Sequence, residues 1–315
     1  MSDGESILRK HRLEMLATGS TDRQIRRWID EGMMTRVWRG TYHQGTKLEP
    51  WVELALSARS AAERSAADLV LSHAAAAALH GMEVLTFDWC TVEFTRDGRR
   101  GGSRDGRRRV HVRRLDAEDI AAVDGLAVTT VARTALDLAL AGTFEQAVCS
   151  LDAALRMGIS RGELAAAMDR LGRRRGIAML RAALPEADGR SESVGESRSR
   201  ALMLTWPEIP RPVLQREFFN RAGALEARVD FLFGETVVGE FDGAGKRTKG
   251  FDADARLKRD TLLMERGLWP THWGAGLRRA GSTPDQAPRR SPSARPAARQ
   301  LLPREFAIRA GVATR

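Results

Sequence analysis

The chain has 315 residues, a length that favours two or three domains over one ordinary hydrophobic core. Its hydrophobic fraction of 43% is compatible with folded domains, and its formal net charge is +10. It has no run of eighteen apolar residues, and the acidic residues 2–6 are unlike a signal peptide, so we expect a cytoplasmic protein with no membrane partner. Cys90 and Cys149 fit a reducing compartment, and the lack of a Cys-x-x-Cys or His-x-x-x-His pair argues against a structural zinc site.

The positive charge is concentrated in two segments. Residues 96–114 and residues 278–315 each hold nine arginines and two acidic residues, which gives +7 in each and leaves −4 for the rest of the chain. The first segment lies within the expected folded body and can contact phosphates, although a solvated arginine-rich loop is the alternative. The second is rich in proline, arginine, serine and alanine, and we expect a basic, disordered tail there.

In chain order, residues 1–48 predict a winged helix-turn-helix. A first helix is expected to break at Gly19, and Ser20 or Thr21 can cap a second helix over residues 22–31. Apolar and polar residues alternate over residues 33–42, as expected for a two-stranded wing. The polar side chains that we expect to contact DNA are Arg23, Gln24, Arg26 and Arg27 on the second helix and Arg36 and Arg39 on the wing.

The stretch Met34-Thr-Arg-Val-Trp-Arg-Gly-Thr-Tyr42 resembles a strand of the N-terminal domain of AbiEi-type antitoxins. In that family the domain binds DNA, often at the operator of its own operon. The resemblance therefore implies double-stranded DNA as a partner and a cognate toxin as a second candidate partner. A winged helix used only for packing or protein contacts is the alternative, because a fold does not fix a function.

Residues 49–188 predict a mixed α/β region followed by helices. Residues 71–81 are typical of a short helix that carries His73 and His80, which we interpret as capping or packing residues because no third ligand is near in sequence. Strands are expected on either side of the arginine-rich segment. Amphipathic helices then follow over residues 132–140, 147–156, 161–171 and 177–184. Asp137 and Asp152 lie within these helices as solvated or arginine-paired carboxylates.

Residues 228–246 carry the chemistry of the C-terminal part, because they predict a β-hairpin that bears carboxylates. Two β-branched and aromatic runs flank Gly234 and Glu235, which is a hairpin signal. Asp230, Glu240 and Asp242 belong to residue types that are rare in strands and costly to bury unpaired. They either lie on an exposed face or bind a hard cation such as Mg²⁺.

The register of the hairpin decides whether these carboxylates can act together. Glu240 and Asp242 are two residues apart and share a face. A three-residue loop over residues 234–236 places Asp230 opposite Glu240, whereas a two-residue loop places it opposite Gly239 and turns it to the other face. We predict the three-residue loop; Asp230 and Glu240 on opposite faces would argue against a metal site.

We expect residues 189–277 to form a restriction-endonuclease-like α/β domain, because the segment from about Ser191 to Gly267 resembles one. The resemblance is to the Vsr-like proteins of domain of unknown function 559, in the PD-(D/E)xK superfamily. It rests on Ser191-Glu-Ser-Val-Gly-Glu196-Ser-Arg, Arg228-Val-Asp230-Phe, Gly239-Glu240-Phe-Asp242-Gly-Ala-Gly-Lys246 and Leu257-Lys258-Arg259-Asp260. In that superfamily a helix-borne glutamate, an aspartate and a second glutamate bind the metal, and a lysine orients the attacking water. The positions that match as catalytic residues are Glu196, Asp230, Glu240 and Lys246, with Asp242 beside them as a further metal ligand for Mg²⁺.

Simpler roles are open for the same residues. Ser193 and Glu196 also form a capping box, and Asp230 and Glu240 can belong to a solvated sheet edge. Lys246 can be part of a basic turn, since Arg247 follows it.

The sequence departs from the superfamily in two places. The lysine normally lies two residues after the acidic residue, where this chain has Asp242, so Lys246 or Lys258 would have to reach in. Pro270 cannot donate to a central ladder, so the strand after Gly267 is expected to be shortened, displaced or absent, and the sheet incomplete. Either a shifted reading frame after about Gly267 or natural divergence would account for this segment.

The sequence therefore predicts an α/β chain, α+β overall, of the antitoxin or transcriptional-regulator type. The endonuclease-fold domain either cleaves DNA with Mg²⁺ or is degenerate and only binds DNA or a partner protein. No small-molecule cofactor is expected.

Overall fold

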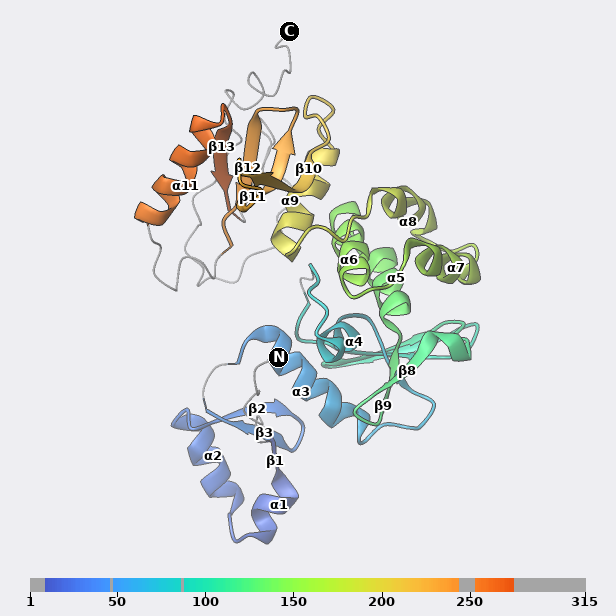
Figure 1. Cartoon of the computed structure of the whole chain (residues 1–315). Helices are drawn as coiled ribbons and strands as arrows, with labels where there is room; N and C mark the ends of the chain where they lie inside the picture. The colour runs from blue at the N-terminus through green and yellow to red at the C-terminus, as the bar shows by residue number, and fades with distance from the viewer. Residues whose placement is uncertain (1–8, 46–47, 86–87, 244–252, 275–315) are drawn as a thin grey trace. The chain divides into compact units, whose positions relative to one another are not determined.

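The structure is a computed structural model, and it describes residues 9–45, 48–85, 88–243 and 253–274 (Figure 1). Lys246 and the expected tail over residues 278–315 lie outside the described residues. The fold class is α/β overall, as predicted, with helices and mixed sheets. The chain divides into two compact units, Met1–Pro185 and Glu186–Arg315. None of the helices in the described ranges has the length and apolarity that a membrane crossing requires.

The N-terminal part of the first unit contains two short helices and a three-stranded sheet. The helix α2 begins after Thr21, whose hydroxyl accepts a hydrogen bond from the Gln24 amide while the Gln24 side chain accepts one from the Thr21 amide. Ile25 on α2 is buried against Met15, Met34 and Tyr42. The elements are β1 (Arg9–His11), α1 (Arg12–Ala17), α2 (Asp22–Asp30), β2 (Met34–Trp38) and β3 (Thr41–Gln44), and the sheet order is β1-β3-β2.

The middle of the first unit is built on a six-stranded mixed sheet in the order β6-β7-β5-β4-β9-β8. Part of the arginine-rich segment forms two of its strands, and β6 pairs antiparallel with β7. Leu54, Leu71 and Phe94 lie in the core that α3 and α4 form with this sheet. The elements are α3 (Pro50–Ala62), β4 (Val70–Leu71), α4 (His73–His80), β5 (Val92–Arg96), β6 (Gly102–Asp105), β7 (Arg108–Val112), η1 (Ala117–Asp119), β8 (Ile120–Val123) and β9 (Leu126–Thr129).

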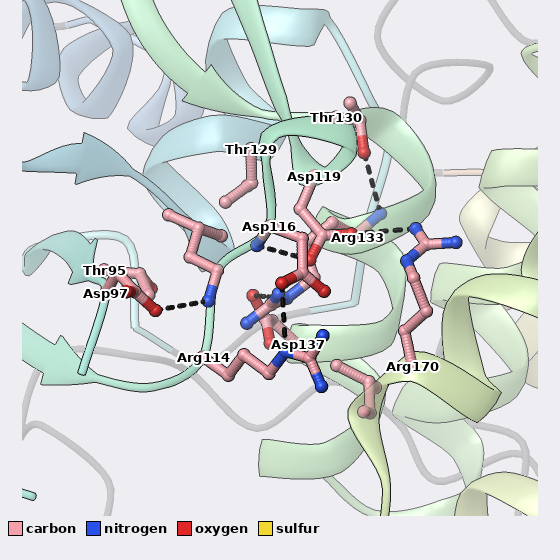
Figure 2. Close-up of polar contacts among 12 residues, drawn as sticks. Thr95, Asp97, Arg114, Asp116, Asp119, Thr129, Thr130, Arg133, Asp137 and Arg170 are labelled. Carbon is pink, nitrogen blue, oxygen red and sulfur yellow. Dashed lines mark hydrogen bonds and ion pairs between the residues drawn. The ribbon is translucent and has the colours of Figure 1, made fainter. Parts of the chain in front are cut away.

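Four helices complete the first unit, and all four were predicted from sequence. They are α5 (Val131–Ala141), α6 (Phe144–Arg156), α7 (Arg161–Leu171) and α8 (Ile177–Ala183), followed by the turn η2 (Leu184–Glu186). An ionic network holds this region together (Figure 2). Arg133, which is 1% exposed, pairs with Asp119 at 2.6 Å and with Asp137 at 2.9 Å, and Arg170 also pairs with Asp119 at 2.9 Å. Asp137 was predicted to be either solvated or paired with an arginine, and the structure shows the arginine pair.

The second unit is a four-stranded sheet between two helices. Met203 of α9 packs on one face with Phe231 and Phe233, and Leu263 of α11 packs on the other with Leu232 and Val238. The elements are α9 (Val194–Leu204), β10 (Val213–Phe219), β11 (Leu225–Phe233), β12 (Val237–Phe241), α11 (Ala253–Glu265) and β13 (Trp269–Trp273). The sheet order is β10-β11-β12-β13, and β13 runs parallel to β12.

The strand expected to be shortened, displaced or absent is present as β13. Pro270 pairs with Val238 within a parallel ladder of five residue pairs, so the ladder continues through the proline. The physical reason is the position of β13 at the edge of the sheet, where a strand needs hydrogen bonds on one side only. Trp273 at its end is buried in the same cluster as Phe231.

Candidate functional site

The six side chains predicted to contact DNA are all exposed on the winged-helix region. Two of them already have local partners. Gln24 belongs to the capping box of α2, and Arg27 Nε donates to Glu31 Oε1 at 2.7 Å. In the described part of the chain, none of the other four, which are Arg23, Arg26, Arg36 and Arg39, has a carboxylate within ion-pair distance.

Three of these arginines come together in one groove. Arg26 of α2 and Arg36 and Arg39 of the wing line a groove together with Arg12 and Arg64. A neighbouring groove is lined by Arg36, Arg39, Arg64, Arg107 and Arg108. Because Arg36, Arg39 and Arg64 line both, the arginine-lined surface extends from the winged helix onto the six-stranded sheet, with Asp22 in the first groove and Asp105 in the second. We call these residues the arginine groove: Arg12, Arg26, Arg36, Arg39, Arg64, Arg107 and Arg108.

Sequence reasoning missed two residues that fix the arginine groove. Arg64 Nη1 donates to the carbonyl oxygen of Arg39, which holds the β2–β3 turn. Arg107 donates to the carbonyl oxygen of Val37 at 3.0 Å and lies over the Trp38 ring at 5.7 Å. The arginine-rich composition pointed to Arg107 only as a phosphate contact, and no sequence pattern pointed to Arg64.

In the second unit the hairpin register is the predicted one. Phe233 pairs with Val237 and Phe231 with Gly239, so the loop comprises residues 234–236. The ladder ends at the pair Phe231 and Gly239, one residue short of Asp230 and Glu240. The backbone amide of Phe241 donates to Asp230 Oδ2 at 2.9 Å, so Asp230 caps the end of the ladder.

The structure brings Glu196 and Asp230 together through Gln215. Gln215 Nε2 donates to Glu196 Oε2 at 3.0 Å and to Asp230 Oδ1 at 3.4 Å. Gln215 lies on β10 with a backbone φ of +52°, a value that residues other than glycine rarely adopt. No sequence pattern had singled it out.

Half of the capping box that the sequence left open is present at Glu196. The Ser193 hydroxyl accepts from the Glu196 amide at 3.2 Å, and the Glu196 carboxylate accepts from the Glu192 amide at 2.8 Å. Burial raises the pKa of Glu196, and the charge of Asp230 raises it further, against the hydrogen bonds from Glu192, Ser193 and Gln215.

Glu240 and Asp242 lie toward the other helix. Glu240, which is 7% exposed, accepts from Arg259 Nη2 at 2.7 Å, and Asp242 accepts from Arg256 Nη1 at 3.2 Å. Both arginines belong to α11, whereas Glu196 belongs to α9 on the opposite face of the sheet. Glu240 and Asp242 are thus held by arginines, and the proposed metal ligands Asp230, Glu240 and Asp242 do not converge as one group within 4.8 Å among the described residues.

A different group of potential ligands does converge, in the first unit. His73, Glu93 and His111 each offer one ligand atom, and these atoms all lie within 4.8 Å of one another. Burial lowers the pKa of His73. Burial alone would raise the pKa of Glu93, but the hydrogen bond with His111 and nearby positive charges outweigh it and hold that pKa below its usual range. His80, the other histidine of α4, lies outside the group with Nε2 2.8 Å from the Thr129 carbonyl oxygen.

Comparison with known proteins gives little on function. No family model matches the chain. Two uncharacterized proteins of Mycobacterium tuberculosis, MT2308 of strain CDC 1551 and Rv2248 of strain H37Rv, are each 39% identical over 112 residues, which is 35% of this chain and 41% of the relative. The chain thus spans less than half the length of these curated relatives. The crystal structure of the RV2827C protein from Mycobacterium tuberculosis aligns with a TM-score of 0.36 at 16% identity, over 68% of this chain and 84% of that one.

Proposed function

We propose that the chain is a DNA-binding protein of the antitoxin or transcriptional-regulator type, which holds double-stranded DNA against the arginine groove. The observation that carries this proposal is the convergence of Arg26, Arg36 and Arg39 in one groove without a carboxylate partner in the described residues. Guanidinium groups in such surroundings attract phosphates, and each phosphate they neutralise releases counterions.

The contacts of the winged helix suggest a division of roles. Gln24 is used in the cap and Arg27 in an ion pair, so Arg23 and Arg26 are the side chains of α2 that are available to enter a groove of the duplex. Arg36 and Arg39 flank them on the wing and fit phosphate contacts, which position a protein on DNA without reading sequence. The fixed turn at Arg39 supports this, because Arg64 holds its backbone.

The test is a salt series of duplex binding. Fluorescence anisotropy with a random-sequence duplex should give an affinity that falls linearly on a logarithmic salt scale. The double variant Arg26→Ala with Arg36→Ala should bind more weakly and reduce that slope by about 2. The matched control is Arg190→Ala, because Arg190 is an exposed arginine that pairs with Asp188 in the second unit. Equal affinity and slope in wild type and the double variant would remove the arginine groove from the interface.

Magnesium-dependent DNA cleavage is a second candidate function. The pairing of Glu196 and Asp230 across Gln215 favours it, since two carboxylates next to each other suit a hard cation. The full ligand set does not fit as it stands, because Glu240 and Asp242 are held by Arg259 and Arg256. A non-catalytic domain that binds DNA or a partner protein, such as a cognate toxin, is the alternative.

Plasmid cleavage separates these two forms of the proposal. Wild type and Asp230→Ala are incubated with supercoiled plasmid and Mg²⁺. Nicking by wild type that is lost in Asp230→Ala would establish an enzyme. No nicking by either protein would leave the DNA-binding regulator, whose own test is the salt series above.

A further inference from the structure

Three side chains of the first unit converge outside the arginine groove. Glu93 on β5 and His111 on β7 share one face of the sheet, because these parallel neighbours pair Glu93 with Arg109 and Thr95 with His111. His73, at the start of α4, lies against them, and its ring stacks on that of His111 with the centroids 4.1 Å apart. One ligand atom from each residue lies within 4.8 Å of the other two.

Two imidazoles and one carboxylate are a ligand set for borderline transition metals rather than for magnesium or calcium. Zinc binds nitrogen ligands at about 2.0–2.1 Å and carboxylate oxygens at about 2.0–2.2 Å, and catalytic sites often hold it with three protein ligands. We propose that His73, Glu93 and His111 bind a zinc-class divalent ion, through one nitrogen of each histidine and one oxygen of Glu93. This site is independent of DNA binding by the arginine groove and of the carboxylates in the second unit.

The contacts behind His73 support this role. His73 Nδ1 lies 3.0 Å from the Ser72 hydroxyl, and the Thr95 hydroxyl donates to Ser72 at 2.9 Å. A histidine that binds a metal through one nitrogen commonly has such a partner at the other, which fixes its ring and tautomer. Because Ser72 is fully buried, this partner is not exchanged for solvent, and Nε2 of His73 is left for the ion.

Binding requires a rearrangement at His111. Its Nε2 lies 3.0 Å from Glu93 Oε1, and the planes of the two histidine rings are tilted by only 21°. In a tetrahedral site the ligand atoms are about 3.4 Å apart, as follows from metal–ligand bonds of about 2.1 Å. The His111 ring must therefore turn out of its stack on His73, so that the nitrogen lone pairs of both histidines point to one metal position. Arg109, half exposed and 3.9 Å from Glu93, can withdraw when the ion supplies the positive charge.

The experiment is a metal titration of the full chain after treatment with a chelator. Co²⁺ binding is followed by its visible absorption, and Zn²⁺ affinity is measured by competition with a chromophoric chelator. Wild type should bind about one equivalent through nitrogen ligands. His111→Gln and Glu93→Gln should each weaken binding by more than about 10-fold. The first matched control is His80→Gln, because His80 lies on α4 with His73 but its Nε2 is 2.8 Å from the Thr129 carbonyl oxygen. The second is His272→Gln, because His272 lies 3.0 Å from Asp260 in the second unit.

Each outcome decides the proposal. Equal affinity in wild type and His111→Gln, or loss of binding in His272→Gln instead, would overturn it. No binding by wild type would overturn it as well. If the variants of the proposed metal ligands fail to fold, X-ray absorption spectra of the Zn²⁺-loaded wild type test the site instead. Two imidazole ligands are expected, and fewer than two around the zinc would reject the site.

Discussion

Three arginines of the arginine groove and the arginine at the centre of the middle region carry the same charge in opposite surroundings. Arg26, Arg36 and Arg39 lie on the surface and have no carboxylate within ion-pair distance among the described residues. Arg133 is 1% exposed and pairs with Asp119 and Asp137. A count of positive charges treats these arginines alike, whereas their neighbours leave the first group available for the proposed DNA contact and make the second part of the fold.

The acidic residues of the chain show the same contrast. Burial alone would raise the pKa of Asp119, but hydrogen bonds and charges from Arg170 and Arg133 outweigh it and hold that pKa below its usual range. Glu196 has Asp230 nearby, and its pKa is raised by burial and by that charge. An acidic residue beside another acidic residue is more readily explained by a ligand, while one between arginines is explained by stability.

The largest expected effect comes from breaking the buried network. Arg133→Met should lower the free energy of unfolding by about 3–5 kcal/mol, because Asp119 and Asp137 would lose their shared cation in a buried site. Arg36→Met, at an exposed arginine, should change it by less than about 0.5 kcal/mol. Urea unfolding followed by circular dichroism measures both. Similar losses in the two variants would mean that burial does not separate the two groups of arginines.

A smaller effect, visible as a pH dependence, is expected at two glutamates in the same sequence context. Glu163 and Glu196 each lie three residues after a serine that caps a helix. Hydrogen bonds from Ser160 lower the pKa of Glu163, whereas burial and Asp230 raise that of Glu196. A raised pKa in the folded state stabilises the protein below the unfolded value of about 4.3, and this contribution is lost as the pH rises through the folded value. A lowered pKa in the folded state stabilises the protein above the unfolded value, and this contribution is lost as the pH falls through the folded value.

The two glutamine variants should therefore diverge from wild type in opposite directions. From pH 4 to pH 7, Glu196→Gln should gain stability relative to wild type, and Glu163→Gln should lose it. Urea midpoints measured at half-unit steps of pH test this. A parallel course for the two variants would show that Asp230 and burial do not distinguish Glu196 from an ordinary capping glutamate.

Much of the fold could be predicted where local patterns determine it. The helices α5, α6 and α7 have side-chain caps, and α8 shares their alanine-rich sequence. The three-residue loop over residues 234–236 was predicted because it allows Asp230 to pair with Glu240. The strands β1 and β6 were not predicted, because they are short and largely exposed, so their pairing with β3 and β7 creates them. The alternative that Pro270 removes the strand was wrong, because the order of the described strands, which places β13 at the edge, cannot be deduced from one proline.

The sites were predicted less completely, because each depends on contacts between distant residues. The sequence placed Asp230 opposite Glu240, but the arginine that draws Glu240 toward α11 comes from a helix beyond the hairpin. His73 was interpreted as a packing residue because no third ligand is near it in sequence. The parallel pairing of β5 with β7 brings Glu93 and His111 beside it, and that pairing has no signature in any one segment.

The smallest effect is expected at the cap of the helix that carries the exposed arginines. The sequence allowed Ser20 or Thr21 as the cap, and the structure has Thr21, whose hydroxyl accepts from the Gln24 amide. Thr21→Ala should cost about 1 kcal/mol of unfolding free energy, whereas Ser20→Ala should cost less. Because the cap orders the first turn of α2, Thr21→Ala should also weaken duplex binding through Arg23 without changing the charge. Urea unfolding and anisotropy on the same two variants separate these effects: a loss of stability with unchanged DNA affinity would place the DNA contacts on the wing rather than on α2.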